Sequence, residues 1–209
     1  MGLVAQGKFE AGWIETFSIE ALKALATARK SVESGAADAA FARWFGDVPD
    51  AAERKEVGKL LGVVRSNINI RSISVGFMAL KHRKANQNAR AWNVKAPQLD
   101  LGTALAGPGA GGINTIELDL NFKSLPDYLP TLADGSVDST AGHQSKFETV
   151  LHELTHVLLG TADAKLDNGH TAYGAQAAEL LATQAPERAI LNAENWGIFI
   201  EAVGRNEST

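Results

Sequence analysis

The sequence predicts an α+β fold that is mostly helical and contains one small sheet. In the first and last thirds of the 209-residue chain, apolar residues recur three and four positions apart, which is the spacing of one helix face. The middle third instead contains short segments of strand character. Hydrophobic residues make up 45% of the chain, enough to bury a core, so we expect one domain over 1–209, helical at about 17–66 and mixed at about 67–209.

Three helices are expected in the N-terminal part. Ser18 is a typical N-cap for the first helix, which Ser34-Gly35 ends. A short helix at 37–45 follows, and the third runs from Pro49-Asp50 to about residue 66. The face that this third helix is expected to bury consists of Val57, Leu60, Leu61 and Val64.

Two strands and two connections are expected in the middle of the chain. Residues 70–75 and 115–120 have strand character, and the second segment alternates strictly. The glycine-rich segment at 107–112 is expected to be a flexible loop, and a phosphate-binding role is disfavoured because no Gly-Lys-Ser/Thr follows it. Residues 126–142, which begin with a proline, are expected to form a long connection.

The C-terminal third returns to helices. Ser145, with Glu148 three residues later, has the spacing of a capping box and predicts the start of a helix that Gly160 ends. Further helices are expected from Tyr173 to Thr183 and from Pro186 onward, where proline suits a first helical position. The apolar residues expected on the capped helix are Val150, Leu151, Leu154, Val157 and Leu158.

Composition excludes several classes of protein. Twenty Lys and Arg against 24 Asp and Glu give a net charge of −4, which argues against a nucleic-acid binder, and the basic run at 81–84 with Arg90 nearby is expected to be a solvated loop. The absence of cysteine excludes disulfides and cysteine-based zinc fingers. No apolar run reaches the length that spans a membrane, and Lys8 and Glu10 break the N-terminal segment, so we expect no signal peptide there.

The capped helix carries the sequence HELTH at 152–156. His152 and His156 lie one turn apart on one helix face, about 6 Å from each other, so both imidazoles can reach one tetrahedral zinc ion. Glu153 projects beside them and can take a proton from water that attacks a peptide carbonyl. The alternative is an accidental pattern on a surface helix. The apolar neighbours favour the metal site, because buried polar residues need partners and a metal supplies them.

Further residues extend this pattern. Gly160-Thr161-Ala162-Asp163 follows the second histidine, and Tyr173-Gly174 lies beyond it. In these residues the chain resembles the deuterolysin-like or aspzincin zinc metallopeptidases, which include the fungal peptidyl-Lys endopeptidases and carry H-E-x-x-H followed by G-T-x-D-x-x-Y-G. The resemblance covers about 17–201. Its other landmarks are Trp44-Phe45-Gly46, the strand at 115–118, Pro186-Glu187-Arg188-Ala189, and Asn192-Ala193-Glu194-Asn195 with Phe199.

The resemblance implies a zincin-like metallopeptidase fold built around the HExxH helix. It implies that His152, His156 and Asp163 bind Zn²⁺ and that Glu153 is the general base. It also implies that Tyr173 hydrogen-bonds the developing oxyanion, which suits its O–H donor. Two alternatives remain open, because Asp163 could cap a turn and Tyr173 could serve packing.

Two departures from the family pattern affect the expected site. Nine residues separate Asp163 from Tyr173 where the family has two, and this insertion contains Asp167 and His170, either of which could be the third ligand instead. Asp163 is favoured because the Gly-Thr-x-Asp segment is intact and a ligand close to the helix end loses less entropy on closure. The chain also lacks the disulfides of the secreted fungal members, which is typical of a bacterial relative.

The resemblance implies a zinc-dependent endopeptidase, a hydrolase, acting as a monomer on protein or peptide substrates that pair with the strand near 113–119. Lysine-specific members present acidic residues to the residue after the cut; Glu194 matches one such position, whereas Gly197 falls where another would be. We therefore expect a modest preference for a basic residue there. The alternatives are a catalytically silent binding module of the same fold, and a delivered bacterial toxin or effector domain. We expect secretion or delivery without an N-terminal signal peptide, or otherwise a cytoplasmic location.

Overall fold

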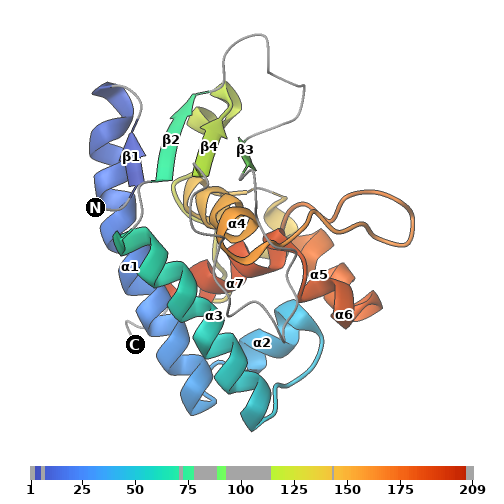
Figure 1. The fold of residues 1–209 in the computed structure, drawn as a ribbon. Coiled ribbons are helices and arrows are strands. Elements are labelled where there is room, and N and C mark those ends of the chain that lie inside the picture. The colour runs from blue at the N-terminus through green and yellow to red at the C-terminus, as the bar shows by residue number, and fades with distance from the viewer. Residues whose placement is uncertain are drawn as a thin grey trace.

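The computed structural model describes residues 3–5, 8–70, 73–77, 89–92, 114–142 and 144–205 (Figure 1). The basic run at 81–84 and the glycine-rich loop at 107–112 lie outside these residues. The helices are α1 (Lys8–Ser34), α2 (Asp38–Phe45), α3 (Ala51–Ile70), α4 (Lys146–Leu159), α5 (Ala175–Gln184), α6 (Pro186–Ala189) and α7 (Ala193–Arg205). The strands are β1 (Leu3–Ala5), β2 (Ile73–Phe77), β3 (Ala89–Trp92) and β4 (Asn114–Leu118), and two short 3₁₀ helices are η3 (Leu120–Ser124) and η4 (Ser139–Ala141).

The predicted class is confirmed: the described chain is mostly helical with one small mixed sheet. The strand order is β1-β2-β4-β3, with parallel pairing except between β3 and β4. The two expected strands are present as β2 and β4, shifted by a few residues. The expected strand at 115–120 ends at Leu118 because the Asp119 side chain accepts a hydrogen bond from the Asn121 N–H and starts η3. Strands β1 and β3, of three and four residues, were not predicted.

Helix α1 begins ten residues before the expected cap at Ser18. Inside the helix, the Ser18 hydroxyl donates to the carbonyl of Ile14 at 2.7 Å, so the N-cap prediction was wrong. The apolar face explains the extension, because Ile14 and Phe17 are buried and continue the face beyond the expected start. The predicted end is confirmed by Gly35, whose φ of 81° is costly for other residues.

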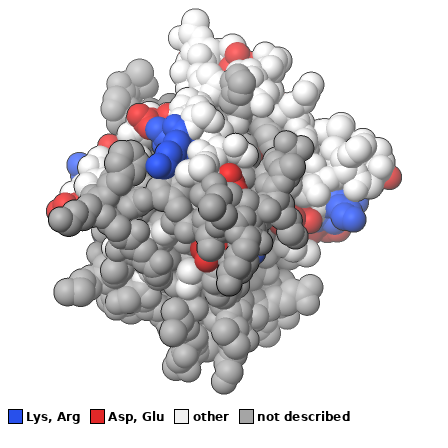
Figure 2. All heavy atoms as spheres, turned by 90° about the horizontal axis from the view of Figure 1, so that it is seen from above, with Lys and Arg blue, Asp and Glu red and all other residues white. Residues whose placement is uncertain are grey.

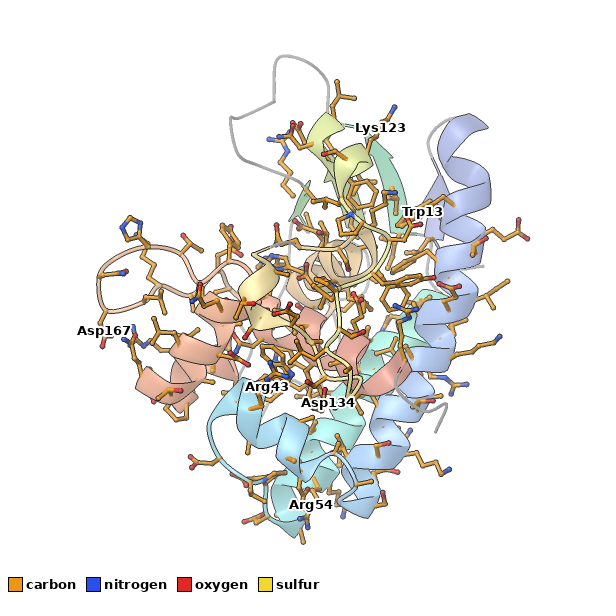
Figure 3. All side chains as sticks on the ribbon, turned by 180° about the vertical axis from the view of Figure 1, so that it is seen from behind. Trp13, Arg43, Arg54, Lys123, Asp134 and Asp167 are labelled. Atoms are coloured by element: carbon orange, nitrogen blue, oxygen red, sulfur yellow. The ribbon has the colours of Figure 1, made fainter. Side chains whose placement is uncertain are left out.

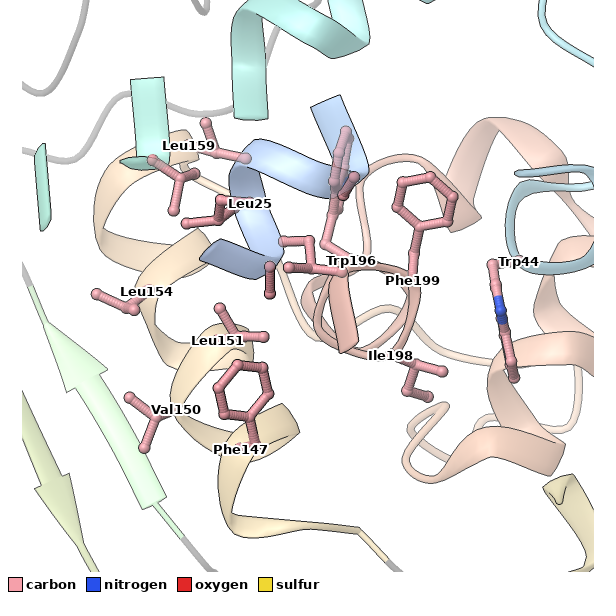
Figure 4. Close-up of a cluster of buried hydrophobic side chains, with 14 of the residues drawn as sticks. Leu25, Trp44, Phe147, Val150, Leu151, Leu154, Leu159, Trp196, Ile198 and Phe199 are labelled. Carbon is pink, nitrogen blue, oxygen red and sulfur yellow. The ribbon is translucent and has the colours of Figure 1, made fainter. Parts of the chain in front are cut away.

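The core lies where α1, α4 and α7 meet beneath the sheet (Figure 1). Figure 4 shows apolar side chains of α4 and α7 facing one another, with Leu25 of α1 between them. Aromatic rings extend this core toward α2, since the Phe45 ring lies 5.1 Å from that of Trp196 and 5.3 Å from that of Phe199. Helix α4 is therefore surrounded by packed helices and the sheet, and polar residues on it need partners inside the protein.

The Trp44-Phe45-Gly46 segment fixes α2 against the C-terminal helices. The Asn195 side-chain amide donates to the carbonyls of both Trp44 and Ala178. At Gly46, a Cβ atom would lie 2.5 Å from the carbonyl oxygen of Ala182, so a larger residue does not fit. These contacts give a physical reason for two of the sequence landmarks, because both join the helices that support α7.

Charged side chains on the face above the sheet are mixed in sign. Figure 2 shows small separate groups of acidic and basic atoms on the described part of this face. None of the helices in the described ranges is both long and apolar enough to cross a membrane.

Candidate metal centre

Helix α4 presents the HELTH residues from within the core. The Ser145 hydroxyl accepts a hydrogen bond from the Glu148 N–H at 2.8 Å, which confirms the predicted cap, and Gly160 ends the helix with a φ of 75°. The reciprocal half of the capping box is absent, because both carboxylate oxygens of Glu148 are buried without a hydrogen-bond partner. The Ser145 hydroxyl instead donates to Glu201 at 2.6 Å. The Glu148 carboxyl group instead lies near the His152 ring, on the same side of the helix.

Two histidines and one aspartate converge at a single point. The Nε2 atoms of His152 and His156 lie 3.0 Å apart, and each lies 3.2 Å from Oδ1 of Asp163. Ligand atoms at zinc bond lengths in a tetrahedron are separated by roughly 3.3 Å. The three atoms therefore have nearly the separation that one tetrahedral zinc ion requires, and they leave a fourth position for water or substrate.

The hydrogen bonds of the other ring nitrogens support a cation at this point. Nδ1 of His152 lies 2.9 Å from Oε2 of Glu194, and Nδ1 of His156 lies 2.7 Å from the carbonyl oxygen of Thr161. Since both partners can only accept, each Nδ1 carries the proton and each Nε2 presents a lone pair when the ring is neutral. Two lone pairs and a carboxylate then face one another, an arrangement that needs positive charge between them. A bound metal ion would supply that charge.

Asp163 is held in place by the start of α7. The backbone of Ala162 bonds to residues on both sides of Asn192, with the Ala162 N–H donating to Leu191 at 2.9 Å and its carbonyl accepting from Ala193 at 3.0 Å. One residue after Asp163, the Ala164 N–H donates to the Asn192 side chain at 2.9 Å. Backbone contacts on both sides therefore fix the aspartate, which gives the Asn192 landmark a role in the site.

The insertion between Asp163 and Tyr173 folds back on itself. Lys165 and Thr171 form an antiparallel bridge, and the Ala172 N–H donates to the Ala164 carbonyl at 2.9 Å. The two ends of the insertion are therefore adjacent, and Asp163 and Tyr173 are neighbours in space despite the nine residues between them. The extra length alters the spacing in sequence but leaves Asp163 and Tyr173 close together.

Neither alternative third ligand joins the histidines. Asp167 lies at the outer part of the inserted loop, where its carboxylate forms an ion pair with Arg188 (Figure 3). His170 is exposed on the same loop. Among the described residues, the two groups that could hold a metal ion are His152, His156 and Asp163, and Glu148, His152 and Glu194. The placement favours Asp163 as the third ligand, although its ligand role stays a prediction.

Comparisons with known proteins agree with this geometry. Residues 130–201, which include every expected site residue, match the model of the aspzincin M35 family, described as lysine-specific metallo-endopeptidases. The matched part of the chain is similar to this family. Its fold is similar to that of a solved zinc peptidase from Grifola frondosa, with a TM-score of 0.50, 21% identity, and coverage of 88% of this chain and 93% of that one. No curated protein matches the sequence.

The family is one of metallo-endopeptidases, which are hydrolases. In this chain, the expected general base lies beside the histidines. Glu153 is 5% exposed, and its Oε2 atom has no hydrogen-bond partner. Burial raises the pKa of Glu153 above its ordinary value, and the nearby histidines oppose this rise. A carboxylate with one free oxygen and a raised pKa is a suitable proton acceptor near neutral pH.

Tyr173 lies at the exposed side of this site. Its side chain is half exposed, and its ring centroid is 6.1 Å from that of His152. Burial and the neighbouring Asp163 carboxylate raise the pKa of Tyr173 well above its ordinary range. The phenol therefore stays protonated at neutral pH and can donate a hydrogen bond, as the oxyanion role requires. Its neighbour Gly174 donates its N–H to Glu194 at 2.5 Å, which holds the turn that carries the tyrosine.

Glu194 occupies a different environment from the one expected of a substrate-binding residue. It is fully buried, and its carboxylate contacts the His152 ring, the Gly174 N–H and the Gln144 side chain. The sequence predicted Glu148 only as a capping-box residue. In the structure it lies beside Glu194, also fully buried, with Oε1 at 3.9 Å from Nδ1 of His152. The available signal was its position four residues before His152, on the same helix face.

The ionisable groups of this site shift one another's pKa values. Burial opposes ionisation of Asp163, but hydrogen bonds with His152 and His156 outweigh it and hold the pKa of Asp163 well below its ordinary value. Burial likewise opposes the charged form of His152, yet Asp163 and Glu194 raise its pKa well above the ordinary value. Both shifts show that the acidic groups of the site attract positive charge to it. A zinc ion bound here would compete with protons for the same atoms.

Proposed function

We propose that this protein is an active zinc-dependent endopeptidase in which His152, His156 and Asp163 hold the metal. The observation that carries the proposal is the convergence of three acceptor atoms within 3.0–3.2 Å, with Glu153 next to them and one of its oxygens unpaired. A silent binding module could keep the fold and the metal, but it would have no need of a buried, unpaired carboxylate, whose burial is costly.

The chain's own residues account for each proton movement in peptide hydrolysis. Zinc, when bound, supplies Lewis-acid chemistry by polarising the carbonyl and acidifying water. Glu153 accepts a proton from the water whose oxygen adds to the carbonyl carbon. As the C–N bond breaks, Glu153 returns that proton to the leaving amine nitrogen. The Tyr173 hydroxyl donates a hydrogen bond to the carbonyl oxygen, where negative charge develops.

The substrate is proposed to align with β3, which differs from the sequence-based expectation. Strand β4, expected to bind the substrate near 113–119, is paired with β2 on one side and β3 on the other from Thr115 to Leu118. Its backbone groups are therefore already bonded. Among the described strands, β3 is at an end of the sheet, and it packs against α4. An extended peptide can add to this edge by backbone hydrogen bonds.

Substitution of Glu153 by glutamine tests the proposed reaction. The change removes the base but no metal ligand, so zinc content and folding should be unchanged while turnover falls about 100- to 10,000-fold. Purified wild type and Glu153→Gln, each with measured zinc content, would be compared on denatured casein. Hydrolysis by wild type should stop with 1,10-phenanthroline and return with added zinc. Wild-type turnover by the zinc-loaded variant would contradict the mechanism.

We further propose a modest preference for a basic residue after the cut. The support is the description of the family as lysine-specific. The acid expected to confer this preference, Glu194, is buried, so the preference should be weaker than that of an enzyme with acidic side chains exposed to the substrate. The cleavage sites in the casein digest, identified by mass spectrometry, measure it directly. A site list with no excess of lysine or arginine after the cut would refute the preference.

A further inference from the structure

We infer that Glu194 is a positioning residue, which fixes the His152 ring for the metal and fixes the turn that carries Tyr173. The inference rests on the proposed zinc site and assigns Glu194 a role other than the substrate contact expected from the sequence. It starts from the contacts of one fully buried carboxylate, whose two oxygens accept hydrogen bonds from different segments.

Oε2 of Glu194 determines which nitrogen of His152 faces the site. The distance of 2.9 Å to Nδ1 is that of a hydrogen bond, and a carboxylate accepts it strongly. With the proton held on Nδ1, Nε2 is left as the lone-pair atom that points toward His156 and Asp163. Carboxylates that hold the second nitrogen of a metal-binding histidine raise its basicity and orient its ring.

Oε1 of Glu194 holds the turn that carries Tyr173. It accepts the Gly174 N–H at 2.5 Å, and Gly174 is the residue directly after Tyr173. Gly174 is also the N-cap of α5, and it has no side chain that could accept a hydrogen bond from the first amides of that helix. One carboxylate on α7 therefore connects α4, which carries the histidines, with the turn before α5, which carries the tyrosine.

Glu148 is the natural control, because it is an equally buried glutamate in the same environment. Its Oε1 atom lies 3.9 Å from Nδ1 of His152, beyond hydrogen-bond distance, and neither of its oxygens has a hydrogen-bond partner. Gly197 leaves the space that this side chain occupies, since a Cβ atom there would lie 2.8 Å from Oε1 of Glu148. Of the two buried acids near Nδ1, only Glu194 is placed to hold its proton.

The test compares Glu194→Gln with Glu148→Gln by zinc affinity, measured in competition with a chelator. Glutamine preserves volume but is a weaker acceptor, so we expect Glu194→Gln to weaken zinc binding about 10- to 100-fold. Glu148→Gln should bind zinc as wild type does. Glu194→Asp, which keeps the charge, should recover part of the loss. Circular dichroism of each variant checks that the fold is intact.

A second measurement reports the ring itself and does not depend on activity. Long-range ¹H–¹⁵N NMR of histidine-labelled protein, with His152 assigned by substitution, distinguishes a nitrogen that carries a proton from one with a lone pair. We expect the proton on Nδ1 in zinc-loaded wild type, and in the metal-free protein at alkaline pH, with a shift toward Nε2 in metal-free Glu194→Gln.

The outcomes separate the positioning role from the proposed function. If wild type binds zinc tightly and Glu194→Gln binds it equally well, the positioning role is wrong while the zinc site stands. If wild type binds no zinc, the proposed function fails, and the metal-free spectra still decide whether Glu194 holds the Nδ1 proton. A second zinc equivalent with loss of the Nδ1 proton signal would overturn the inference, because it would place a metal between Glu148 and Glu194.

Discussion

Replacing Gly197 with alanine is expected to destabilise the protein at the contact between α7 and α4. A Cβ atom at this position would lie 2.8 Å from Oε1 of Glu148, 3.0 Å from its carbonyl oxygen and 3.2 Å from the backbone nitrogen of His152. The last two atoms belong to the turn of α4 that carries His152, so they cannot move independently of the metal site. Overpacking of this kind costs about 1–3 kcal/mol.

Alanine also gains up to about 1 kcal/mol of helix propensity over glycine, which offsets part of that cost. Gly12 on α1 provides the control, because nothing lies within 4 Å of a Cβ atom added there. The propensity gain then cancels between the two variants, and their difference in unfolding free energy should equal the packing cost of about 1–3 kcal/mol.

Denaturant unfolding followed by circular dichroism measures this difference for both variants. Each kcal/mol corresponds to a change in Tm of about 2–4 °C for a chain of this size. We expect Gly12→Ala to be as stable as wild type or more stable, and Gly197→Ala to be less stable than Gly12→Ala. Equal stability of the two variants would refute the claim that α7 needs a glycine where it crosses α4.

The remaining predictions concern the third ligand and a buried acid on α7. Asp163→Ala should weaken zinc binding by more than about 100-fold, which exceeds the loss expected for residues that only hold the ligands in place. His170→Ala should keep its metal. Loss of zinc from the His170 variant alone would reverse this assignment. For Glu201, burial raises the pKa from 4.5 to about 6. Because the folded state holds this proton more tightly, its stabilising effect is complete below pH 4.5 and is lost as the pH rises through 6. The stability of Glu201→Gln relative to wild type should therefore rise by about 2 kcal/mol between pH 4 and 7 in urea titrations, and a pH-independent difference would contradict this.

The parts of the fold that could be predicted from the sequence are those with a local signal. Gly35, Gly46 and Gly160 end helices at the expected positions, because each ending depends on one residue adopting a positive φ. Strands β1 and β3 have no such signal, since three or four residues are too few to show a period. The true start of α1 was hidden in the same way: Ser18 suits a cap in isolation, and only packing of Ile14 and Phe17 extends the helix past it.

For the site, local spacing was sufficient for His152, Glu153 and His156, because one helix sets their relative positions. The meeting of Asp163 with these histidines follows from the Asn192 contacts, which join residues far apart in the sequence. The environment of Glu194 was not predictable from spacing either. Whether that carboxylate faces a substrate or the Nδ1 side of His152 depends on how α7 crosses α4, which is a property of tertiary packing.

The inserted loop has a consequence for how such sites are identified from sequence. Since residues 164 and 172 are joined by a backbone hydrogen bond, the segment between them forms a loop whose two ends are adjacent. Its length is thus independent of the distance between the aspartate and the tyrosine. A sequence pattern that requires a set number of residues between the two would overlook proteins built in this way. When such proteins are compared, the useful comparison is between the two positions where the loop begins and ends, because the chain brings these positions together.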